Sequence, residues 1–349
     1  MSSTARAITT AAGGVPGAAS SAAAVRTVLG TMSIPNPLDA ESARAALELF
    51  RGAGHEEVDT AIMYQGGEAE RTLGELGVST SGNFRVAVKV NPWYADGKTH
   101  PDPVGGLRPD RMREQLRTSL GSLRAGKAHL LYLHAPDSST PLEDTLRTVH
   151  EMGPAGEGLF EEWGMSNYAA WQVVDTFHIC RANGWCTPSV YQGMYNAVTR
   201  EVERELLPAL RSLGMRFYAY NPLAGGILSG KHAFTSDPQQ GRFNGGTLWG
   251  RRYRDRFWKE ETFTALDNLR ALCDAEGTTL VSASLRWLYH HSELSGELGD
   301  AVIVCGSSLE QTGQNVAASV EKEPLPEAIV GAFEEAWIAA KPQCPSYFR

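Results

Sequence analysis

The alternation of short and long segments along the chain limits its fold more than any other feature. From about residue 25 onward, short runs rich in β-branched and aromatic residues alternate with helix-length amphipathic segments. Such alternation is typical of repeated βα units. We predict eight strands, at residues 27–31, 57–60, 85–90, 129–134, 161–165, 189–192, 216–220 and 301–305.

The segments between the strands carry helical periodicity. In residues 109–123, Met112, Leu116, Leu120 and Leu123 share one face, and Pro109 suits a first helical turn. Helices are predicted at residues 40–51, 68–76, 109–123, 142–149, 169–183, 201–213, 260–276 and 309–317, with extra helices at 279–290 and 326–340. Eight strands with eight helices suggest a closed barrel, but an open doubly wound sheet shows a similar alternation. The motifs must decide between them.

The 349 residues are compatible with one domain, because barrels of about 250 residues with insertions fold as single units. We place this domain at residues 25–349. Residues 1–24 are mainly Ala, Ser, Thr and Gly with one Arg, too little apolar bulk to pack, and we predict a disordered leader. Because the leader lacks acidic residues, a transit peptide stays open as an alternative; the apolar core of a secretory signal is missing.

Charge and composition exclude several classes of protein. A net charge of -8 argues against a nucleic-acid binder, and no apolar run approaches the roughly 18 residues that span a bilayer. The five cysteines are scattered, without a CxxC pair or a histidine at zinc-ligand spacing. We therefore predict a cytoplasmic protein with reduced thiols that binds neither metal, membrane nor nucleic acid.

Polar residues stand where predicted strands end. Asp59 is near the end of the second strand, Tyr64 is in the loop after it, Lys89 is near the end of the third and His134 ends the fourth. In a barrel the C-terminal strand ends share one face, where active sites are built. These four residues are the catalytic candidates.

Together they suit proton donation to a carbonyl. Tyrosine is a weak acid with a pKa of about 10, which the ammonium of Lys89 is expected to lower. Asp59 would keep the lysine charged, and His134 would direct a hydrogen bond at the carbonyl oxygen. Taken singly, Asp59 could cap a loop, Lys89 could pair on the surface and His134 could sit in a turn; their occurrence at three consecutive strand ends favours catalysis.

Several motifs in order resemble the aldo-keto reductases, and within them the aflatoxin-aldehyde-reductase type, similar to succinic semialdehyde reductase. VDTAIMYQGGEAERTLGEL bears Asp59 and Tyr64, AVKVNPW bears Lys89, and LLYLHAPD bears His134. The resemblance runs from about residue 25 to Arg349. It implies an α/β fold, a (β/α)8 TIM barrel with extra helices, that binds NADPH across its top without a Rossmann domain. The chain agrees, since no strand is followed by GxGxxG.

The resemblance also implies residues for the nicotinamide half of the cofactor. Ser166 and Asn167 in GMSNY, with Gln192 in VYQGMYN, would bind the carboxamide, and Tyr220 would stack on the ring. The segment after Tyr220 would follow the pyrophosphate, through Asn221, Leu223, Gly225 and Lys231.

CGSSLEQTGQN resembles the family segment that holds the adenosine end. A helix begins there, and its free N–H groups favour a phosphate. The implied residues are Gly306, Ser307, Ser308, Gln311, Gln314 and Asn315. Many aldo-keto reductases carry a lysine and an arginine here, which Cys305 and Gln311 replace; Arg242 is the expected substitute charge for NADPH.

Residues 234–258 form a predicted long substrate loop, rich in arginine and aromatic residues. The resemblance assigns Tyr253, Arg256 and Arg349 to the substrate. Because arginine pairs with carboxylates, we expect polar, dicarbonyl or carboxylate-bearing aldehydes, such as aflatoxin dialdehyde or succinic semialdehyde. The subfamily resemblance also suggests a homodimer.

Two other functions use the same scaffold: a cofactor-binding regulatory subunit of a membrane channel, and an oxidoreductase acting on alcohols of secondary metabolism. The intact set of four catalytic candidates favours turnover over a purely binding role.

Overall fold

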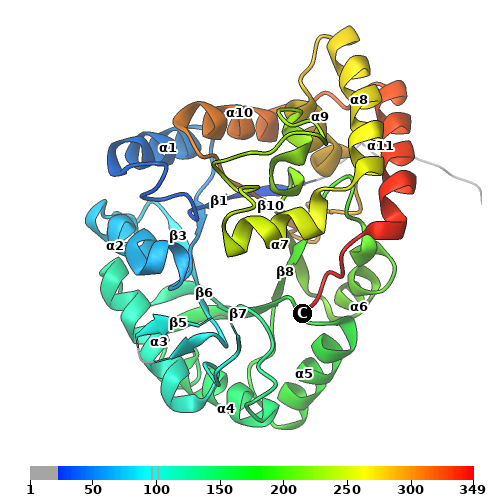
Figure 1. Cartoon of the computed structure of the whole chain (residues 1–349). Coiled ribbons are helices and arrows are strands. Elements are labelled where there is room, and N and C mark those ends of the chain that lie inside the picture. Colours follow the sequence, from blue (N-terminus) through cyan, green and yellow to red (C-terminus); the bar gives the residue numbers. More distant parts are fainter. Residues whose placement is uncertain (1–22, 96, 101) are drawn as a thin grey trace, which may run out of the picture.

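The computed structural model describes residues 23–95, 97–100 and 102–349. The leader predicted at residues 1–24 lies almost wholly outside them. Eight parallel strands close into a barrel in the order β1-β10-β9-β8-β7-β6-β3-β2 (Figure 1). The strands are β1 (Arg26–Gly30), β2 (Glu57–Asp59), β3 (Arg85–Val90), β6 (Ala128–Leu133), β7 (Phe160–Ser166), β8 (Val190–Met194), β9 (Arg216–Tyr220) and β10 (Ala301–Val304). The predicted (β/α)8 barrel is confirmed, and the open sheet is excluded.

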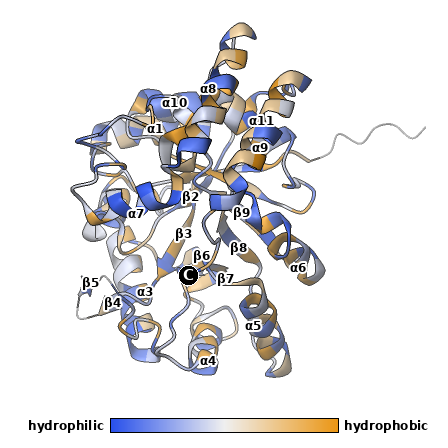
Figure 2. Ribbon diagram, turned by 45° about the vertical axis from the view of Figure 1, so that its right-hand side comes forward, coloured by the Kyte–Doolittle hydropathy of each residue, from blue (hydrophilic) through white to orange (hydrophobic). Residues whose placement is uncertain are grey.

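Helices surround the strands and turn their apolar faces inward (Figure 2). In α3, Met112, Leu116, Leu120 and Leu123 are buried and Pro109 is the first residue, as predicted. The helices are α1 (Ala40–Gly52), α2 (Glu68–Glu75), α3 (Pro109–Leu123), α4 (Leu142–Met152), α5 (Ala170–Ala182), α6 (Leu206–Leu213), α7 (Leu248–Phe257), α8 (Glu260–Ala275), α9 (Leu280–His290), α10 (Leu309–Val320) and α11 (Glu327–Ala340). No helix of the described residues is long and apolar enough to cross a membrane.

The helix predicted at residues 201–213 is interrupted. A short 3-10 turn, η2 (Glu201–Glu203), precedes α6, and Glu205 between them has non-helical dihedral angles, φ -138° and ψ -50°. Pro208 explains the break, because its ring would clash with the carbonyl of Arg204 in a continuous helix.

We predicted one long loop at residues 234–258. This prediction is wrong for the second half of the segment, which forms helix α7. Thr247 caps this helix, and its hydroxyl accepts a hydrogen bond from the amide of Gly250 at 2.9 Å. A side chain at Gly250 would lie 1.8 Å from the carbonyl oxygen of Asn244, so glycine is required. Tyr253 and Phe257, four residues apart, were the available helical signal. A small hairpin, β4 (Tyr94–Ala95) with β5 (Lys98–Thr99), was also not predicted, because strands of two residues show no periodicity.

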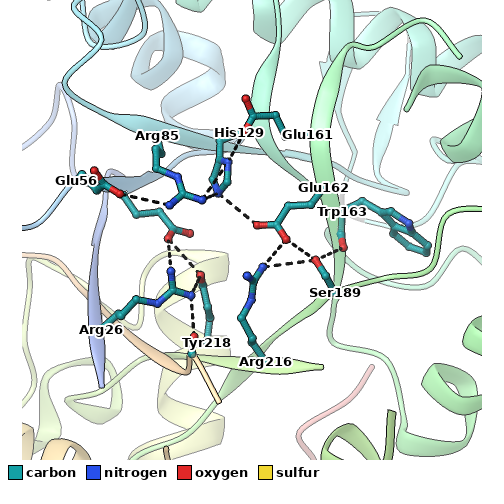
Figure 3. Close-up of polar contacts among 12 residues, drawn as sticks. Arg26, Glu56, Arg85, His129, Glu161, Glu162, Trp163, Ser189, Arg216 and Tyr218 are labelled. Atoms are coloured by element: carbon teal, nitrogen blue, oxygen red, sulfur yellow. Dashed lines mark hydrogen bonds and ion pairs between the residues drawn. The ribbon is translucent and has the colours of Figure 1, made fainter. Parts of the chain in front are cut away.

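Charged side chains cover the N-terminal end of the barrel (Figure 3). His129 contacts Glu161 at 2.9 Å and Glu162 at 3.3 Å, and Arg216 pairs with Glu162 at 2.5 Å. At the same end of the barrel, the hydroxyl of Tyr218 donates a hydrogen bond to the carboxylate of Glu57 at 3.1 Å. With this end occupied by ion pairs, the opposite, C-terminal end of the strands is left for chemistry.

Candidate active site

The four catalytic candidates meet at the C-terminal end of the barrel. Asp59 ends β2, Lys89 lies one residue from the end of β3, His134 follows β6, and Tyr64 begins the 3-10 turn η1 (Tyr64–Gly67). Nζ of Lys89 donates to Oδ1 of Asp59 at 2.5 Å, to the carbonyl of Thr60 at 2.8 Å and to the Tyr64 hydroxyl at 3.3 Å. Lys89 thus contacts both Asp59 and Tyr64, and the three side chains form one hydrogen-bonded group.

The backbone directly after Tyr64 takes an unusual, left-handed conformation. Gln65, Gly66 and Gly67 all have positive φ, at 52°, 67° and 96°. Two glycines suit this conformation, whereas Gln65 is held in it by hydrogen bonds from its amide to the carbonyls of Met32 and Asn36, both at 2.9 Å.

Burial controls the protonation of the catalytic lysine and tyrosine. The side chain of Lys89 is fully buried, which lowers its pKa, while the Asp59 carboxylate acts in the opposite direction. Burial raises the pKa of Tyr64 well above its ordinary value, and the charge of Asp59 raises it further. The expected net lowering of the Tyr64 pKa was wrong, because burial and the charge of Asp59 raise it. Tyr64 is therefore held protonated.

His134 presents a neutral imidazole beside Tyr64. Burial lowers the pKa of His134 well below its ordinary value, and the charges of Lys89 and Arg349 add to that effect. The His134 ring meets the rings of Tyr64 and Trp93 edge-on, with centroids 6.2 and 5.9 Å away. Its buried Nδ1 has no hydrogen-bond partner within the described part of the chain.

Asn167 connects the ends of three strands. It has a left-handed backbone, φ 64°, directly after β7. Its Nδ2 donates to the carbonyl of His134 at 2.8 Å and to Oγ of Ser166 at 2.9 Å, and its Oδ1 accepts from the Tyr220 hydroxyl at 2.9 Å. Gln192 on β8 donates to Oδ2 of Asp59 at 2.9 Å. Four residues predicted for the nicotinamide end thus lie beside the catalytic group.

The chain after β9 turns tightly beside α7. Asn221 is left-handed, and Leu223 precedes the 3-10 segment η3 (Ala224–Ser229), within which Gly225 has φ 70°. A side chain at Gly225 would lie 2.8 Å from the Tyr253 ring. Lys231 lies two residues after η3 and is exposed.

The segment after β10 forms the start of α10. A side chain at Gly306 would lie 2.5 Å from the amide nitrogen of Thr312, so the loop requires glycine there. Ser308 caps the helix and accepts from the amide of Gln311 at 3.2 Å, and the hydroxyl of Ser307 donates to the Gln311 side chain at 2.9 Å. Asn315 donates to the Cys305 carbonyl at 2.9 Å, and Gln314 contacts Glu310 at 3.3 Å.

The C-terminal residue is fixed at the site. The backbone amide of Arg349 donates to the carbonyl of Asn167 at 3.0 Å, and its guanidinium lies 5.6 Å from the centroid of the Trp93 ring. The hydroxyl of Tyr347 accepts from the amide of Ala170 at 3.1 Å. The Trp93 ring contacts both His134 and Arg349, and the sequence reasoning did not assign this residue to the site. Its place three residues after β3 was the available signal.

Comparison with known proteins decides the family. A model of the aldo/keto reductase family matches residues 26–338. This chain belongs to the aldo/keto reductase family. Aflatoxin B1 aldehyde reductase member 2 of Mus musculus is 49% identical over 346 residues, covering 96% of this chain and 91% of the relative. Aflatoxin B1 aldehyde reductase member 4 of Homo sapiens is 47% identical, covering 92% and 96%.

Solved structures show the same fold for this aldo/keto reductase. A glycerol dehydrogenase from Gluconobacter oxydans superposes with a TM-score of 0.72 at 21% identity, covering 93% of this chain and 96% of its own. An aldo-keto reductase from Klebsiella pneumoniae in complex with NADPH gives 0.66 at 21% identity, covering 94% and 98%.

Some polar groups at the top of this aldo/keto reductase have no protein partner. Besides Nδ1 of His134, the buried Nδ2 of Asn221 is unpartnered among the described residues. The guanidinium of Arg242 lies 5.3 Å from the Tyr253 ring centroid and forms no ion pair with any described carboxylate. Buried polar atoms such as those of His134 and Asn221 normally have hydrogen-bond partners. A polar, negatively charged ligand along this face fits them.

Proposed function

We propose that this aldo/keto reductase reduces aldehydes to alcohols with NADPH, and that Tyr64 is the proton donor. The observation that carries the proposal is the position of Nζ of Lys89, bonded to Asp59 and 3.3 Å from the Tyr64 hydroxyl. An ammonium at that distance stabilises a phenolate as it forms, and the carboxylate keeps the ammonium charged in a buried place.

Tyr64 carries its proton before the substrate is reduced. Burial and Asp59 hold Tyr64 protonated, so its O–H is available when a substrate oxygen gains negative charge. The neutral ring of His134 orients the same oxygen through a hydrogen bond. Tyr64 then releases its proton to that oxygen, and Lys89 balances the phenolate left behind.

The residues at the top of the barrel fit NADPH, which when bound supplies the hydride. Ser166, Asn167 and Gln192 would bind its carboxamide, and Tyr220 would pack on the nicotinamide face. The 2′-phosphate would pair with the guanidinium of Arg242, which has no carboxylate partner among the described residues. The phosphates and adenosine would be held by Asn221, Leu223, Gly225, Lys231, Gly306, Ser307, Ser308, Gln311, Gln314 and Asn315.

The substrates are polar aldehydes, including dicarbonyl and carboxylate-bearing ones. Arg349 is fixed beside Trp93 and His134, and Tyr253 and Arg256 lie on α7. A guanidinium fork recognises a carboxylate at the end of the aldehyde remote from the carbonyl. The names of the relatives at 47–49% identity, aflatoxin B1 aldehyde reductases, support an aflatoxin aldehyde among the substrates. A cytoplasmic location and a homodimer remain predictions, which fractionation and analytical ultracentrifugation test.

Purified protein mixed with NADPH and either 2-carboxybenzaldehyde or succinic semialdehyde tests the proposal through the loss of NADPH absorbance. We expect turnover with both aldehydes. Tight NADPH binding without turnover would favour the regulatory role, and alcohol oxidation without aldehyde reduction would favour the secondary-metabolism role.

A further inference from the structure

Helix α2 carries a buried acid that the proposed mechanism does not use. Glu70 lies in the first turn of this helix and is 1% exposed. Its helix neighbours Glu68 and Glu75 pair with Arg71 at the surface. Glu70 itself forms no ion pair within the described part of the chain, and its buried Oε1 has no hydrogen-bond partner there. A buried carboxyl oxygen without a bonded partner is unusual in a folded protein.

Close packing of α2 on α3 buries Glu70 (Figure 1). Gly74 lies one turn after Glu70 on the same face of α2, and a side chain at Gly74 would overlap the carbonyl oxygen of Ser122. Glycine at this position therefore lets the two helices touch. Ser119, one turn before Ser122 on α3, is also buried, and its hydroxyl acts on the carboxyl group of Glu70. The contact between the two helices thus keeps this carboxyl group out of water.

Lys89 is the cation that acts on this carboxyl group. Burial raises the pKa of Glu70 to about 7, while the Ser119 hydroxyl and the charge of Lys89 act against that rise. In return, burial lowers the pKa of Lys89, while the charges of Asp59 and Glu70 raise it. Tyr94 on β4 also faces Glu70, but burial and nearby acids, Glu70 among them, raise the pKa of Tyr94 and keep it neutral. The ammonium of Lys89 therefore feels two carboxyl groups.

The hydrogen bonds of Lys89 leave none for Glu70. The three N–H groups of the ammonium have three acceptors, which are Oδ1 of Asp59, the Thr60 carbonyl and the Tyr64 hydroxyl. The ammonium also lies 4.9 Å from the centroid of the Tyr64 ring. A charge on Glu70 therefore acts on Lys89 through space, and through Lys89 on the proton of Tyr64.

We propose that Glu70 is a positioning residue of the reductase reaction, which sets, by holding or releasing its proton, how strongly Lys89 stabilises the phenolate of Tyr64. The inference rests on the proposed aldehyde reduction. While Glu70 is protonated, Asp59 alone offsets the charge of Lys89. An ionised Glu70 adds a second negative charge, which weakens the stabilisation of the phenolate and slows proton donation to the substrate. Reduction is therefore faster below the pH at which Glu70 ionises.

Single-turnover oxidation of bound NADPH by succinic semialdehyde tests the proposal, because it measures the chemical step without product release. From about pH 6 to about pH 8 we expect the rate of the wild type to fall about fivefold, the scale of one charge acting on another across part of a protein interior. In Glu70→Gln the amide never ionises, so the rate should stay constant. The variant should equal the wild type at the lower pH and exceed it about fivefold at the higher pH.

Glu75→Gln is the matched control, since it removes an exposed acid from the same helix, and its rates should follow the wild type. A purely structural role for Glu70 would make Glu70→Gln slower than the wild type at every pH. That result, or parallel profiles for the variant and the wild type, would overturn the inference.

Nuclear magnetic resonance separates this inference from the proposed function. In protein labelled with 13C at the lysine Cε and saturated with NADP+, the resonance of the buried Lys89 should shift with a midpoint near pH 7 in the wild type and in Glu75→Gln. In Glu70→Gln this shift should be lost. If no aldehyde is reduced, the reductase proposal fails, while the titration still decides whether Glu70 acts on Lys89. A Lys89 resonance that titrates equally in Glu70→Gln, or does not respond near pH 7 in the wild type, refutes that action.

Discussion

Nε2 of Gln192 donates a hydrogen bond to Oδ2 of Asp59 at 2.9 Å, across 133 residues of sequence. The other oxygen of the same carboxylate accepts from Nζ of Lys89 at 2.5 Å. Both carboxylate oxygens of Asp59 thus accept a hydrogen bond, one from Lys89 on β3 and one from Gln192 on β8. These two bonds hold the carboxylate beside the fully buried ammonium of Lys89. Asp59 thus fixes the position of the lysine that contacts the Tyr64 hydroxyl.

Asp59→Asn should damage both activity and stability. The amide keeps the shape but removes the charge, which leaves the ammonium of Lys89 buried without a counter-ion. We expect a loss of about 3–5 kcal/mol in unfolding free energy and a fall in kcat of about 100-fold. Urea denaturation and steady-state kinetics measure the two effects. Glu56→Gln, at the opposite end of β2 with an exposed side chain, is the control and should change neither.

Tyr64→Phe isolates the proton donor. The ring and its packing remain, while the hydroxyl that Lys89 contacts is lost. We expect kcat to fall by about 100-fold or more, with the dissociation constant for NADPH within about twofold of the wild-type value, measured by fluorescence titration. An unchanged kcat would falsify the role of Tyr64.

The catalytic set could be predicted because each member stands at or near the polar end of an apolar strand, and the ends of parallel strands share one face of a barrel. The bond between Gln192 and Asp59 could not, since closure of the barrel, rather than any local spacing, brings β8 opposite β2. The direction of the Tyr64 pKa shift was missed for a related reason. Residue types show which charges are near, but desolvation depends on packing that only the folded chain defines.

The buried carboxyl group of Glu70 on α2 should make the unfolding free energy fall as pH rises from about 4.5 to 7. Burial raises its pKa to about 7, and the charge of Lys89 and the Ser119 hydroxyl offset only part of that shift. Between about 4.5 and 7 the folded state therefore binds more protons than the unfolded state, so the unfolding free energy falls as pH rises through this window. The full effect is about 3 kcal/mol.

Glu70→Gln should remove that dependence, because the amide never ionises. Denaturation in urea at about pH 5 and pH 8 is expected to show a variant more stable than wild type at the higher pH. Glu75→Gln changes an exposed acid of the same helix and should follow the wild type. Parallel pH profiles for wild type and Glu70→Gln would contradict the assignment of this titration to Glu70.

His129, at the N-terminal end of the barrel, should also make the protein less stable as pH rises, although this group is a base and Glu70 is an acid. Burial alone lowers its pKa, but hydrogen bonds to Glu162 and Glu161 outweigh burial and raise it. The stabilising effect is complete below the unfolded pKa of about 6.5 and is lost as pH rises through the folded value. His129→Asn, compared with the exposed His178→Asn, should flatten the decline in melting temperature above pH about 6.5.

A substitution of the Arg349 side chain tests the preference for carboxylate-bearing aldehydes while the C-terminal tail stays in place. Tyr347 is buried and its hydroxyl bonds to Ala170, so removing residues 347–349 together would disturb packing as well as charge. Arg349→Gln removes the charge and keeps the backbone bond to Asn167. We expect KM for 2-carboxybenzaldehyde to rise about tenfold more than KM for benzaldehyde, because only the former presents a carboxylate to the guanidinium. An equal rise in KM for both aldehydes would show that Arg349 affects substrate binding without recognising the carboxylate.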